Sequence, residues 1–219
     1  MDSINVIILA AGGGERFGCY KQFERVRGRT ILEHTVAIYK PFSDRIIVVK
    51  PNDYVLDSPG NIVVTGGKTR FESIRAGFRW VDYGKKIIVV DAVRCNTPHS
   101  IVQELVTTLD DCQVAFPVLR AVNTVCIWDD GVEVYTKKHM YDIQTPTACQ
   151  YDVMKKIIEE GSPDWGFSIV YAADRLGVKP MMPIPGDGYN FKITYPADLE
   201  FFKLLKKTQA ESEPLIPDV

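Results

Sequence analysis

The sequence has little of what marks a membrane protein, a secreted protein or a nucleic-acid-binding protein. No apolar run reaches the roughly 18 residues that a membrane-spanning helix requires, and residues 1–5 lack the basic segment of a signal peptide. The formal net charge is −2, so no overall positive field attracts nucleic acid or a membrane surface. We therefore expect neither partner, and any phosphate binding must depend on local positive charge.

The cysteines are few and badly spaced for pairing. Five occur, an odd number, and no two form a C-x-x-C motif. They are Cys19, Cys95, Cys112, Cys126 and Cys149. This usage argues against a zinc site or a disulfide framework and indicates reduced, mostly buried thiols. We therefore expect a cytoplasmic protein.

The length of 219 residues suits one large domain better than two. Charged residues make up 25% and apolar residues 46%, which is ordinary for a globular domain. The last stretch is rich in carboxylates and prolines. We expect one domain over residues 1–208 and a loose tail over residues 209–219.

Strand-like apolar segments alternate with helical segments through the first half of the chain. Strands are predicted at residues 4–10, 45–49, 61–65, 86–91 and 113–118, and helices at residues 31–39, 70–81 and 98–109. This order predicts an α/β fold with a single doubly wound, mainly parallel sheet covered by helices on both faces. Ligands of such sheets bind at the carboxyl ends of the strands.

The alternation breaks after residue 118. Residues 122–128 and 132–136 flank Asp129-Asp130-Gly131, a hairpin turn signal. We predict an arm over about residues 119–142 that projects from the sheet and packs on a second subunit, because an isolated hairpin is marginal in water. Helices at residues 151–160, 167–176 and 196–206 and a strand at residues 178–184 complete the predicted domain.

A glycine-rich segment directly follows the first strand, from Leu9 to Phe17. Its small residues let backbone N–H groups approach an anion, and Arg16 and Lys21 supply two cations. The segment fits no Walker loop, because no Gly-Lys-Ser/Thr follows, and no acidic residue closes a second strand as in a dinucleotide site. An ordinary strand-to-helix turn with solvated cations fits the segment equally well.

Two further signals fall where strands end. Gly66 and Gly67 precede a helix with Ser73 about one turn inside it, and helix N-terminal amides favour an anion or the polar edge of a base. Asp91 closes an apolar strand, where carboxylates commonly hold Mg²⁺, and Arg94 would face the same cleft. The alternatives are an ordinary helix start and a local Asp91–Arg94 ion pair.

A last signal is Lys192, which stands between apolar residues in a short extended segment. It is either an edge residue or aimed at an anion.

Taken in order, these motifs resemble the family of 2-C-methyl-D-erythritol 4-phosphate cytidylyltransferases and their relatives that act on ribitol 5-phosphate. The matching elements are Ala10-Ala11-Gly12-x-Gly14-x-Arg16, Lys21-Gln22-Phe23, Gly66-Gly67-x-x-Arg70-x-x-Ser73, Asp91-Ala92-x-Arg94, Gln144-Thr145-Pro146 and Asn190-x-Lys192-Ile193-Thr194. The resemblance covers about residues 4–205. It implies a Rossmann-like nucleotidyltransferase fold, CTP as the nucleotide substrate, Mg²⁺ as the cofactor, transfer of CMP to the phosphate of a small polyol, and a homodimer.

The resemblance also implies a role for each matching residue. Arg16 and Lys21 would stabilise the charge that develops at the α-phosphate, with Asp91 and Lys192 completing the catalytic set. Asp91 would bind Mg²⁺, the acceptor or both, and Arg94 would line the acceptor region. The residues that would hold CTP are Ala10, Ala11, Gly12, Gly14, Gly66, Gly67 and Ser73. An acceptor phosphate is already ionised, so the reaction needs positioning and positive charge and no strong base.

The chain departs from the family pattern mainly on the acceptor side. Tyr151 stands near the position of the arginine that reaches the acceptor phosphate in the partner subunit, and Lys137 and Lys138 would replace that arginine. The segment from Arg16 to Lys21 is shorter than usual, with Tyr20 in place of a proline. These departures predict a different phosphorylated, or phosphonate, acceptor, whose identity the sequence does not give.

Three alternatives remain open. The first is a true methylerythritol phosphate cytidylyltransferase with a variant pocket. The second is a catalytically weak homologue that binds nucleotide or assembles with a partner, and the third is a sugar-1-phosphate nucleotidyltransferase that uses another nucleotide.

Overall fold

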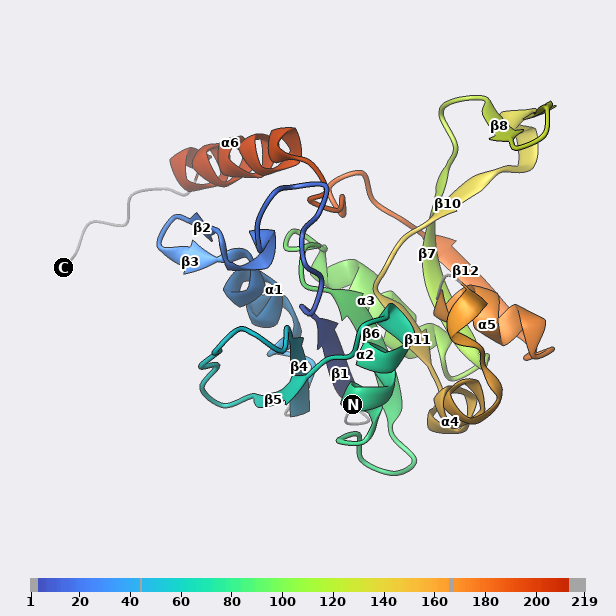
Figure 1. Ribbon diagram of the computed structural model, residues 1–219, viewed down its shortest axis with the longest axis horizontal. Helices are drawn as coiled ribbons and strands as arrows, with labels where there is room; N and C mark the ends of the chain where they lie inside the picture. The colour runs from blue at the N-terminus through green and yellow to red at the C-terminus, as the bar shows by residue number, and fades with distance from the viewer. Residues whose placement is uncertain (1–3, 44, 166–167, 213–219) are drawn as a thin grey trace.

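The computed structural model describes residues 4–43, 45–165 and 168–212. A mixed sheet forms its centre, in the order β10-β7-β11-β6-β1-β4-β5, with β12 also paired to β7 (Figure 1). Its strands are β1 (Ile4–Leu9), β4 (Arg45–Lys50), β5 (Ile62–Thr65), β6 (Lys86–Asp91), β7 (Val114–Arg120), β10 (Tyr141–Ile143), β11 (Thr147–Cys149) and β12 (Met181–Pro185).

The pairing is parallel from β6 through β1 and β4 to β5, whereas β10 and β11 run antiparallel to their neighbours. Strand β1 pairs in parallel with β4 and β6, and β12 pairs in parallel with β7. Strand β11 lies between β6 and β7 and runs antiparallel to both. The predicted mainly parallel sheet is therefore confirmed, whereas β10 and β11 were not predicted.

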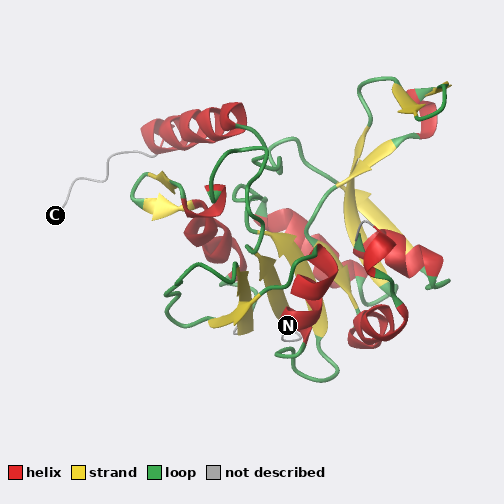
Figure 2. Cartoon of the chain, in the orientation of Figure 1, coloured by secondary structure: helices red, strands yellow, loops and turns green. Residues whose placement is uncertain are grey.

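Helices cover both faces of the sheet (Figure 2). They are α1 (Ile31–Tyr39), α2 (Arg70–Phe78), α3 (His99–Thr108), α4 (Tyr151–Glu160), α5 (Ile169–Arg175) and α6 (Pro196–Ser212). Because side chains alternate along a strand, β1 is buried on both sides. Val6 and Ile8 belong to the apolar core that contains α1 and α3, and Ile7 belongs to the core that contains α2, α4 and α5. This is the predicted doubly wound architecture.

The ends of the helices show how local sequence sets them. The Thr30 hydroxyl accepts a hydrogen bond from the Glu33 amide, while the Glu33 carboxylate accepts one from the Thr30 amide, so α1 begins at its predicted residue. Helix α2 ends at Phe78, before the predicted residue 81. Helix α6 continues to Ser212, past its predicted end at residue 206 and into the segment expected to be loose. The rest of that segment, residues 213–219, lies outside the described residues.

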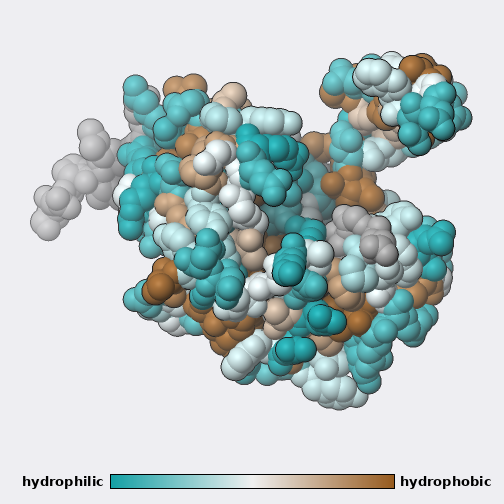
Figure 3. Space-filling model, in the orientation of Figure 1, coloured by the Kyte–Doolittle hydropathy of each residue, from teal (hydrophilic) through white to brown (hydrophobic). Residues whose placement is uncertain are grey.

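The predicted arm projects from the sheet beyond β7 and β10 (Figure 1). Strands β8 (Val125–Trp128) and β9 (Val132–Tyr135) form a separate antiparallel hairpin, followed by the 3-10 turn η2 (Lys137–His139). Apolar side chains lie among hydrophilic ones on its surface (Figure 3), and Trp128 is 85% exposed. Another small ribbon, β2 (Arg25–Val26) with β3 (Arg29–Thr30), precedes α1. No helix in the described part of the chain is both long and apolar enough to cross a membrane.

Candidate active site

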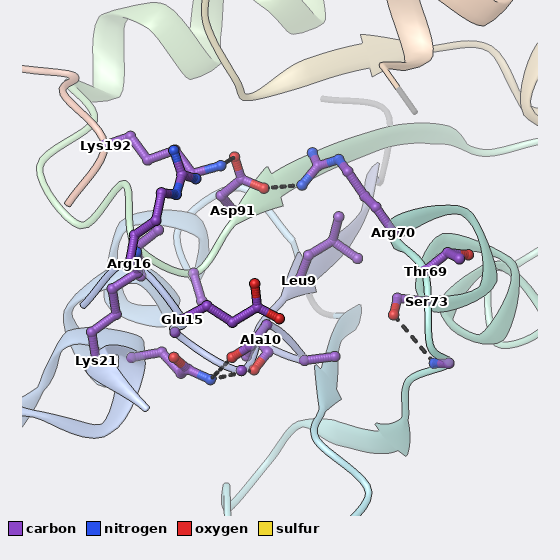
Figure 4. Close-up of a pocket in the computed structure, with 18 of the residues that line it drawn as sticks. Leu9, Ala10, Glu15, Arg16, Lys21, Thr69, Arg70, Ser73, Asp91 and Lys192 are labelled. Carbon is purple, nitrogen blue, oxygen red and sulfur yellow. Dashed lines mark hydrogen bonds and ion pairs between the residues drawn. The ribbon is translucent and has the colours of Figure 1, made fainter. Parts of the chain in front are cut away.

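A pocket of about 350 Å³ opens at the carboxyl ends of β1 and β6, the edge at which ligands of such sheets bind (Figure 4). The glycine-rich segment after β1, the start of α2, the end of β6 and Lys192 surround it. Its lining residues are Leu9, Ala10, Ala11, Gly12, Gly13, Gly14, Glu15, Arg16, Lys21, Gln22, Gly67, Lys68, Thr69, Arg70, Ser73, Asp91, Ala92, Val93 and Lys192. The structure thus brings together most of the site residues that the sequence predicts.

The glycine-rich segment is held by a side chain whose role the sequence analysis missed. Gln22 is buried, and its amide nitrogen donates to the carbonyl oxygens of Ala10, at 2.7 Å, and Gly12, at 3.0 Å. A buried amide deprived of such partners costs about 1–3 kcal/mol, so these bonds fix the path of the segment. Gln22 was visible only as a motif residue beside Lys21, because a neutral amide carries no charge signal.

The same segment requires glycine at one position. Gly14 has a φ of +74°, and a Cβ added there would lie 1.8 Å from the carbonyl oxygen of Cys19. The amides of Phe17 and Gly18 both donate to the Gly14 carbonyl oxygen at 2.8 Å. Any side chain at this position would therefore force open the tight turn that carries Arg16.

Three cations converge on one side of the pocket. Lys21 donates to the carbonyl oxygen of Thr194 at 3.4 Å and lies 5.8 Å from the centre of the Phe17 ring. Burial lowers the pKa of Lys21, and the nearby charges of Lys192 and Arg16 lower it further. The mutual repulsion of these cations identifies a place where an anion would be stabilised.

Asp91 lies at the centre of the pocket wall and is 6% exposed. One of its carboxylate oxygens pairs with Arg70, and the other lies 2.9 Å from Lys192 Nζ and accepts a hydrogen bond from Thr145 Oγ1 at 3.3 Å. Burial alone would raise the pKa of Asp91, but the charges of Arg70 and Lys192 outweigh it and hold that pKa below its usual range. Asp91 is therefore ionised at neutral pH and holds two cations at the pocket.

Arg70 was not among the predicted site residues. Its position within the motif that begins at Gly66 was noticeable, but its ion pair with Asp91 joins the start of α2 to the end of β6 and depends on the fold. With Arg16, Lys21, Lys68 and Lys192 it gives the pocket five cations against two carboxylates, Glu15 and Asp91. The positive excess suits a polyphosphate.

Several amides at the start of α2 already have partners within the protein, which the sequence did not predict. The Gly67 amide donates to Ser73 Oγ at 3.2 Å, and the amides of Lys68 and Thr69 donate to the Glu72 carboxylate at 2.6 and 3.2 Å. Thr69 in turn accepts from the Glu72 amide. The helix is thus capped by its own side chains. Gly67 and Ser73 line the pocket and would contact a ligand there.

Gly66 and Arg94 do not line the pocket. The Gly66 amide donates to the Lys50 carbonyl oxygen at 2.9 Å, and a Cβ there would lie 2.6 Å from that of Ala11, so Gly66 serves close packing beneath the pocket. Arg94 is largely buried, which lowers its pKa, and its guanidinium donates to the carbonyl oxygen of Asn190. Its buried Nε has no hydrogen-bond partner among the described residues. The contact of Arg94 with the acceptor therefore stays a prediction.

The other predicted acceptor residues lie far from the pocket within one protomer. Lys137 and Lys138 line a separate hollow at the base of the arm, where Lys137 Nζ donates to the Val122 carbonyl oxygen at 3.0 Å. Tyr151 begins α4, with its ring centre 5.1 Å from those of Phe78, at the end of α2, and Tyr83, in the turn that precedes β6. A contact with the acceptor from a second subunit stays a prediction for all three.

The site has few carboxylates for a divalent metal, namely Asp91 and Glu15. The described residues hold no group of three or more His, Cys, Asp or Glu side chains that could bind a metal ion. Both oxygens of Asp91 already contact cations. Since Mg²⁺ often binds through one or two carboxylates plus substrate phosphates, these residues fit a metal shared with a triphosphate and not one held by the protein alone.

Comparison with known proteins matches this arrangement. The family model described as "IspD: 2-C-methyl-D-erythritol 4-phosphate cytidylyltransferase" matches residues 4–205. The chain is 29% identical to the 2-C-methyl-D-erythritol 4-phosphate cytidylyltransferase of Thermotoga neapolitana over 92% of this chain and 96% of the relative. It is 28% identical to that of Chromobacterium violaceum, over 94% and 98%.

Solved structures agree on the fold. The crystal structure of the 2-C-methyl-D-erythritol 4-phosphate cytidylyltransferase from Thermus thermophilus superposes with a TM-score of 0.80 at 24% identity, over 94% of this chain and 99% of that chain. A structure of 4-diphosphocytidyl-2C-methyl-D-erythritol synthase gives a TM-score of 0.79 at 23% identity, over 94% and 100%.

Proposed function

This chain belongs to the 2-C-methyl-D-erythritol 4-phosphate cytidylyltransferase family, and from that membership we propose that it transfers CMP from CTP to the phosphate, or phosphonate, of a small polyol and releases pyrophosphate. It is a CTP-dependent nucleotidyltransferase. The observation that carries the proposal is the group of cations around Asp91, beside a glycine-rich segment at the carboxyl ends of β1 and β6.

The chemistry suits the residues that are present. An oxygen of the acceptor phosphate attacks the α-phosphorus of CTP, a new P–O bond forms, and the bond between the α-phosphorus and the bridging oxygen breaks so that pyrophosphate leaves. Arg16, Lys21 and Lys192 would neutralise the negative charge that grows at the α-phosphate and on the leaving group. The acceptor oxygen needs no deprotonation, which agrees with a pocket lined by neither His nor Cys among the described residues.

The glycine-rich segment would hold the nucleotide. Ala10, Ala11, Gly12 and Gly14 present backbone without bulky side chains, and Gln22 keeps that backbone in place. Gly67 and Ser73 form the facing wall. We propose that the cytidine lies between these two walls, with its triphosphate toward Arg16 and Lys21.

We propose Mg²⁺ as the cofactor, held by Asp91 together with the phosphates of CTP. When bound there, it would neutralise part of the triphosphate charge. Asp91 also orients Arg70 and Lys192, because it forms an ion pair with each of them.

The acceptor is the least constrained part of the proposal. The relatives' names give 2-C-methyl-D-erythritol 4-phosphate, and that compound is one candidate. The second candidate is another phosphorylated or phosphonate polyol, favoured because Tyr151 stands where the family resemblance places an arginine. A lost charge-assisted bond of about 1.5–3 kcal/mol would weaken a phosphate acceptor roughly 10- to 100-fold.

One assay tests both points. Purified protein is incubated with CTP, Mg²⁺ and, in turn, methylerythritol 4-phosphate, ribitol 5-phosphate, glycerol 3-phosphate and small hydroxyalkyl phosphonates, while pyrophosphate release is followed. We expect release with one of them and a low kcat/KM for methylerythritol 4-phosphate. A clear preference for methylerythritol 4-phosphate would establish the first candidate instead. Binding of CTP with no release on any acceptor would favour a catalytically weak homologue.

Assembly and compartment complete the proposal. We propose a homodimer in which the arm of each subunit closes the acceptor side of the other's pocket, since the arm exposes Ile127, Trp128 and Val132. We propose the cytoplasm as its compartment, because all five cysteines are free thiols and three are buried.

A further inference from the structure

A fully buried amide lies beside the pocket in a segment without regular secondary structure. Asn190 has 0% exposure and stands two residues before Lys192. Its Oδ1 accepts from Thr97 Oγ1 at 2.8 Å, and its Nδ2 donates to Gln144 Oε1 at 3.2 Å and to the Thr145 carbonyl oxygen at 3.0 Å. A side chain with all its polar atoms satisfied from three directions fixes the backbone that carries it.

Gln144 makes the reciprocal contacts and is 5% exposed. Its Nε2 donates to the carbonyl oxygens of Asp187, at 3.0 Å, and Asn190, at 3.2 Å, while its Oε1 accepts from the Asp187 amide at 3.3 Å. A Cβ on Gly186 would lie 2.7 Å from the same Oε1, so the turn can close on Gln144 only with glycine there. Gln144 therefore holds the backbone of residues 187–190 by hydrogen bonds at both of its ends.

These two amides join three segments that each place a group at the catalytic centre. The loop after β6 follows Asp91 and contributes Thr97 and Arg94, both of which bond to Asn190. Thr145, next to Gln144, donates to Asp91 Oδ2 at 3.3 Å. Past Asn190, the Ile193 amide donates to the Val93 carbonyl oxygen at 3.0 Å, so the chain that carries Lys192 is fixed at both ends.

We infer that Asn190 and Gln144 are positioning residues that hold the Lys192 ammonium in register with Asp91 and the reacting phosphate. The inference rests on the proposed function for its catalytic consequence, and on the hydrogen bonds alone for its structural part. Both residues are neutral and buried, and neither lines the pocket among the residues described. Their effect is exerted through Lys192.

The first test replaces Asn190 by aspartate. Asn190→Asp keeps the size of the side chain but puts an acceptor where Nδ2 donates to Gln144 and Thr145. We expect kcat to fall on the order of 10- to 100-fold, the cost of displacing a reacting group by about 1 Å. The dissociation constant for CTP without acceptor should change less than about threefold, since the glycine-rich segment is untouched.

A second readout needs no turnover. Lys192 is acetylated with a small amine-reactive reagent, and the rate of its modification is measured by mass spectrometry of the peptide that contains it. Loss of the ion pair with Asp91 should raise that rate severalfold in Asn190→Asp over the native protein. If the native protein releases no pyrophosphate, the proposed function fails, yet the modification rate still tests the positioning of Lys192.

Two further variants keep the inference falsifiable. Thr97→Val removes the hydroxyl that contacts Asn190 Oδ1 at 2.8 Å and the Arg94 carbonyl oxygen at 3.1 Å, at nearly constant volume. It should give smaller changes of the same kind if Asn190→Asp does not fold. Gln150→Ala is the control, because Gln150 donates to the Leu109 carbonyl oxygen at 2.6 Å but lies outside the pocket. It should leave kcat and Lys192 modification unchanged. A fall in kcat without faster modification of Lys192, or no change in either, would overturn the inference.

Discussion

The hydroxyl of Tyr20 lies 2.7 and 2.8 Å from the two carboxylate oxygens of Asp53. This contact ties the stretch between the glycine-rich segment and Lys21 to the loop that follows β4. Edge-to-face contacts of Tyr20 with Phe23 and Tyr54 reinforce it, and those two rings stack at 3.7 Å. Where the family resemblance places a rigid proline, this chain fixes the segment by side-chain contacts.

Removal of that hydroxyl should loosen the segment without harming the fold. We expect Tyr20→Phe to lower kcat/KM for CTP about three- to tenfold, because Lys21 loses part of its orientation. Tyr171→Phe, which removes a hydroxyl from an exposed position on α5, is the matched control. Steady-state kinetics of the two variants provide the comparison, and equal values would assign the Tyr20–Asp53 contact no role in the site.

Charge at the reacting phosphate gives the second prediction. Arg16→Ala and Lys21→Ala should each lower kcat about 100-fold or more, because these cations act where charge develops in the transition state. CTP binding, measured by calorimetry without acceptor, should weaken much less. Lys40→Ala, at an exposed helix end, controls for loss of charge alone. A decrease of only a few fold would place Arg16 and Lys21 among the solvated surface residues.

Asp91 predicts the response to acid. The pKa of Asp91 in the folded protein is held below its ordinary value. Its ion pairs therefore contribute their full stabilisation above about pH 4, and this stabilisation is lost as the pH falls further and the carboxylate is protonated. The folded protein should therefore become less stable from about pH 4 downward. Asp91→Asn should make the free energy of unfolding less dependent on pH below about pH 4, as measured by denaturant unfolding at several pH values. If the free energy of unfolding of Asp91→Asn fell with pH below about pH 4 as steeply as that of the native protein, the arrangement around Asp91 would be contradicted.

Nucleotide choice is the fourth prediction. CTP should be used well above ATP, GTP and UTP, because the residues that match the family are those assigned to the cytidine side. Competition between CTP and each other nucleotide, with pyrophosphate release and product mass as readouts, measures the preference. Equal use of UTP or ATP would contradict the proposal that the pocket walls at Ala11 and Ser73 bind the cytidine.

The arm gives the fifth prediction. A homodimer at micromolar concentration should be seen by sedimentation, since Ile127 and Trp128 are 55% and 85% exposed on a two-stranded ribbon. Trp128→Asp should shift the mass toward the monomer and lower activity together. Leu204→Asp, at an exposed apolar residue of α6 outside the arm, is the control for added charge. A fully active monomer would contradict the proposed role of the arm.

The strands and helices that the sequence predicted best are those with strong local signals. Strands β1 and β6 are continuous apolar runs, and α1 begins at a residue with a hydrogen-bonding cap. Strand β11 has three small or polar residues and no such pattern, and only its neighbours β6 and β7 make it a strand. Local pattern cannot foresee pairing that long-range packing decides.

The candidate site divides in the same way. Arg16, Lys21, Asp91 and Lys192 could be predicted because charged side chains at strand ends and beside glycines are conspicuous. Gln22, Gln144 and Asn190 are neutral amides, and their importance depends on which carbonyl oxygens the fold brings within reach. Arg94 was conspicuous by its charge, yet the sequence does not show that its guanidinium also donates to the carbonyl oxygen of Asn190.

Strand β11 also bears on how the protein is made. Both of its neighbours, β6 and β7, leave the ribosome before it does, and the whole arm is synthesised before the chain returns to Thr147. Until then the buried edges of β6 and β7 have nothing between them, and apolar residues such as Ile88 and Val114 lack their final cover. Non-local pairing of this kind is slow, and uncovered strand edges promote aggregation. A truncated product that ends within the arm should therefore be an insoluble one, even though most of its sheet has already been synthesised.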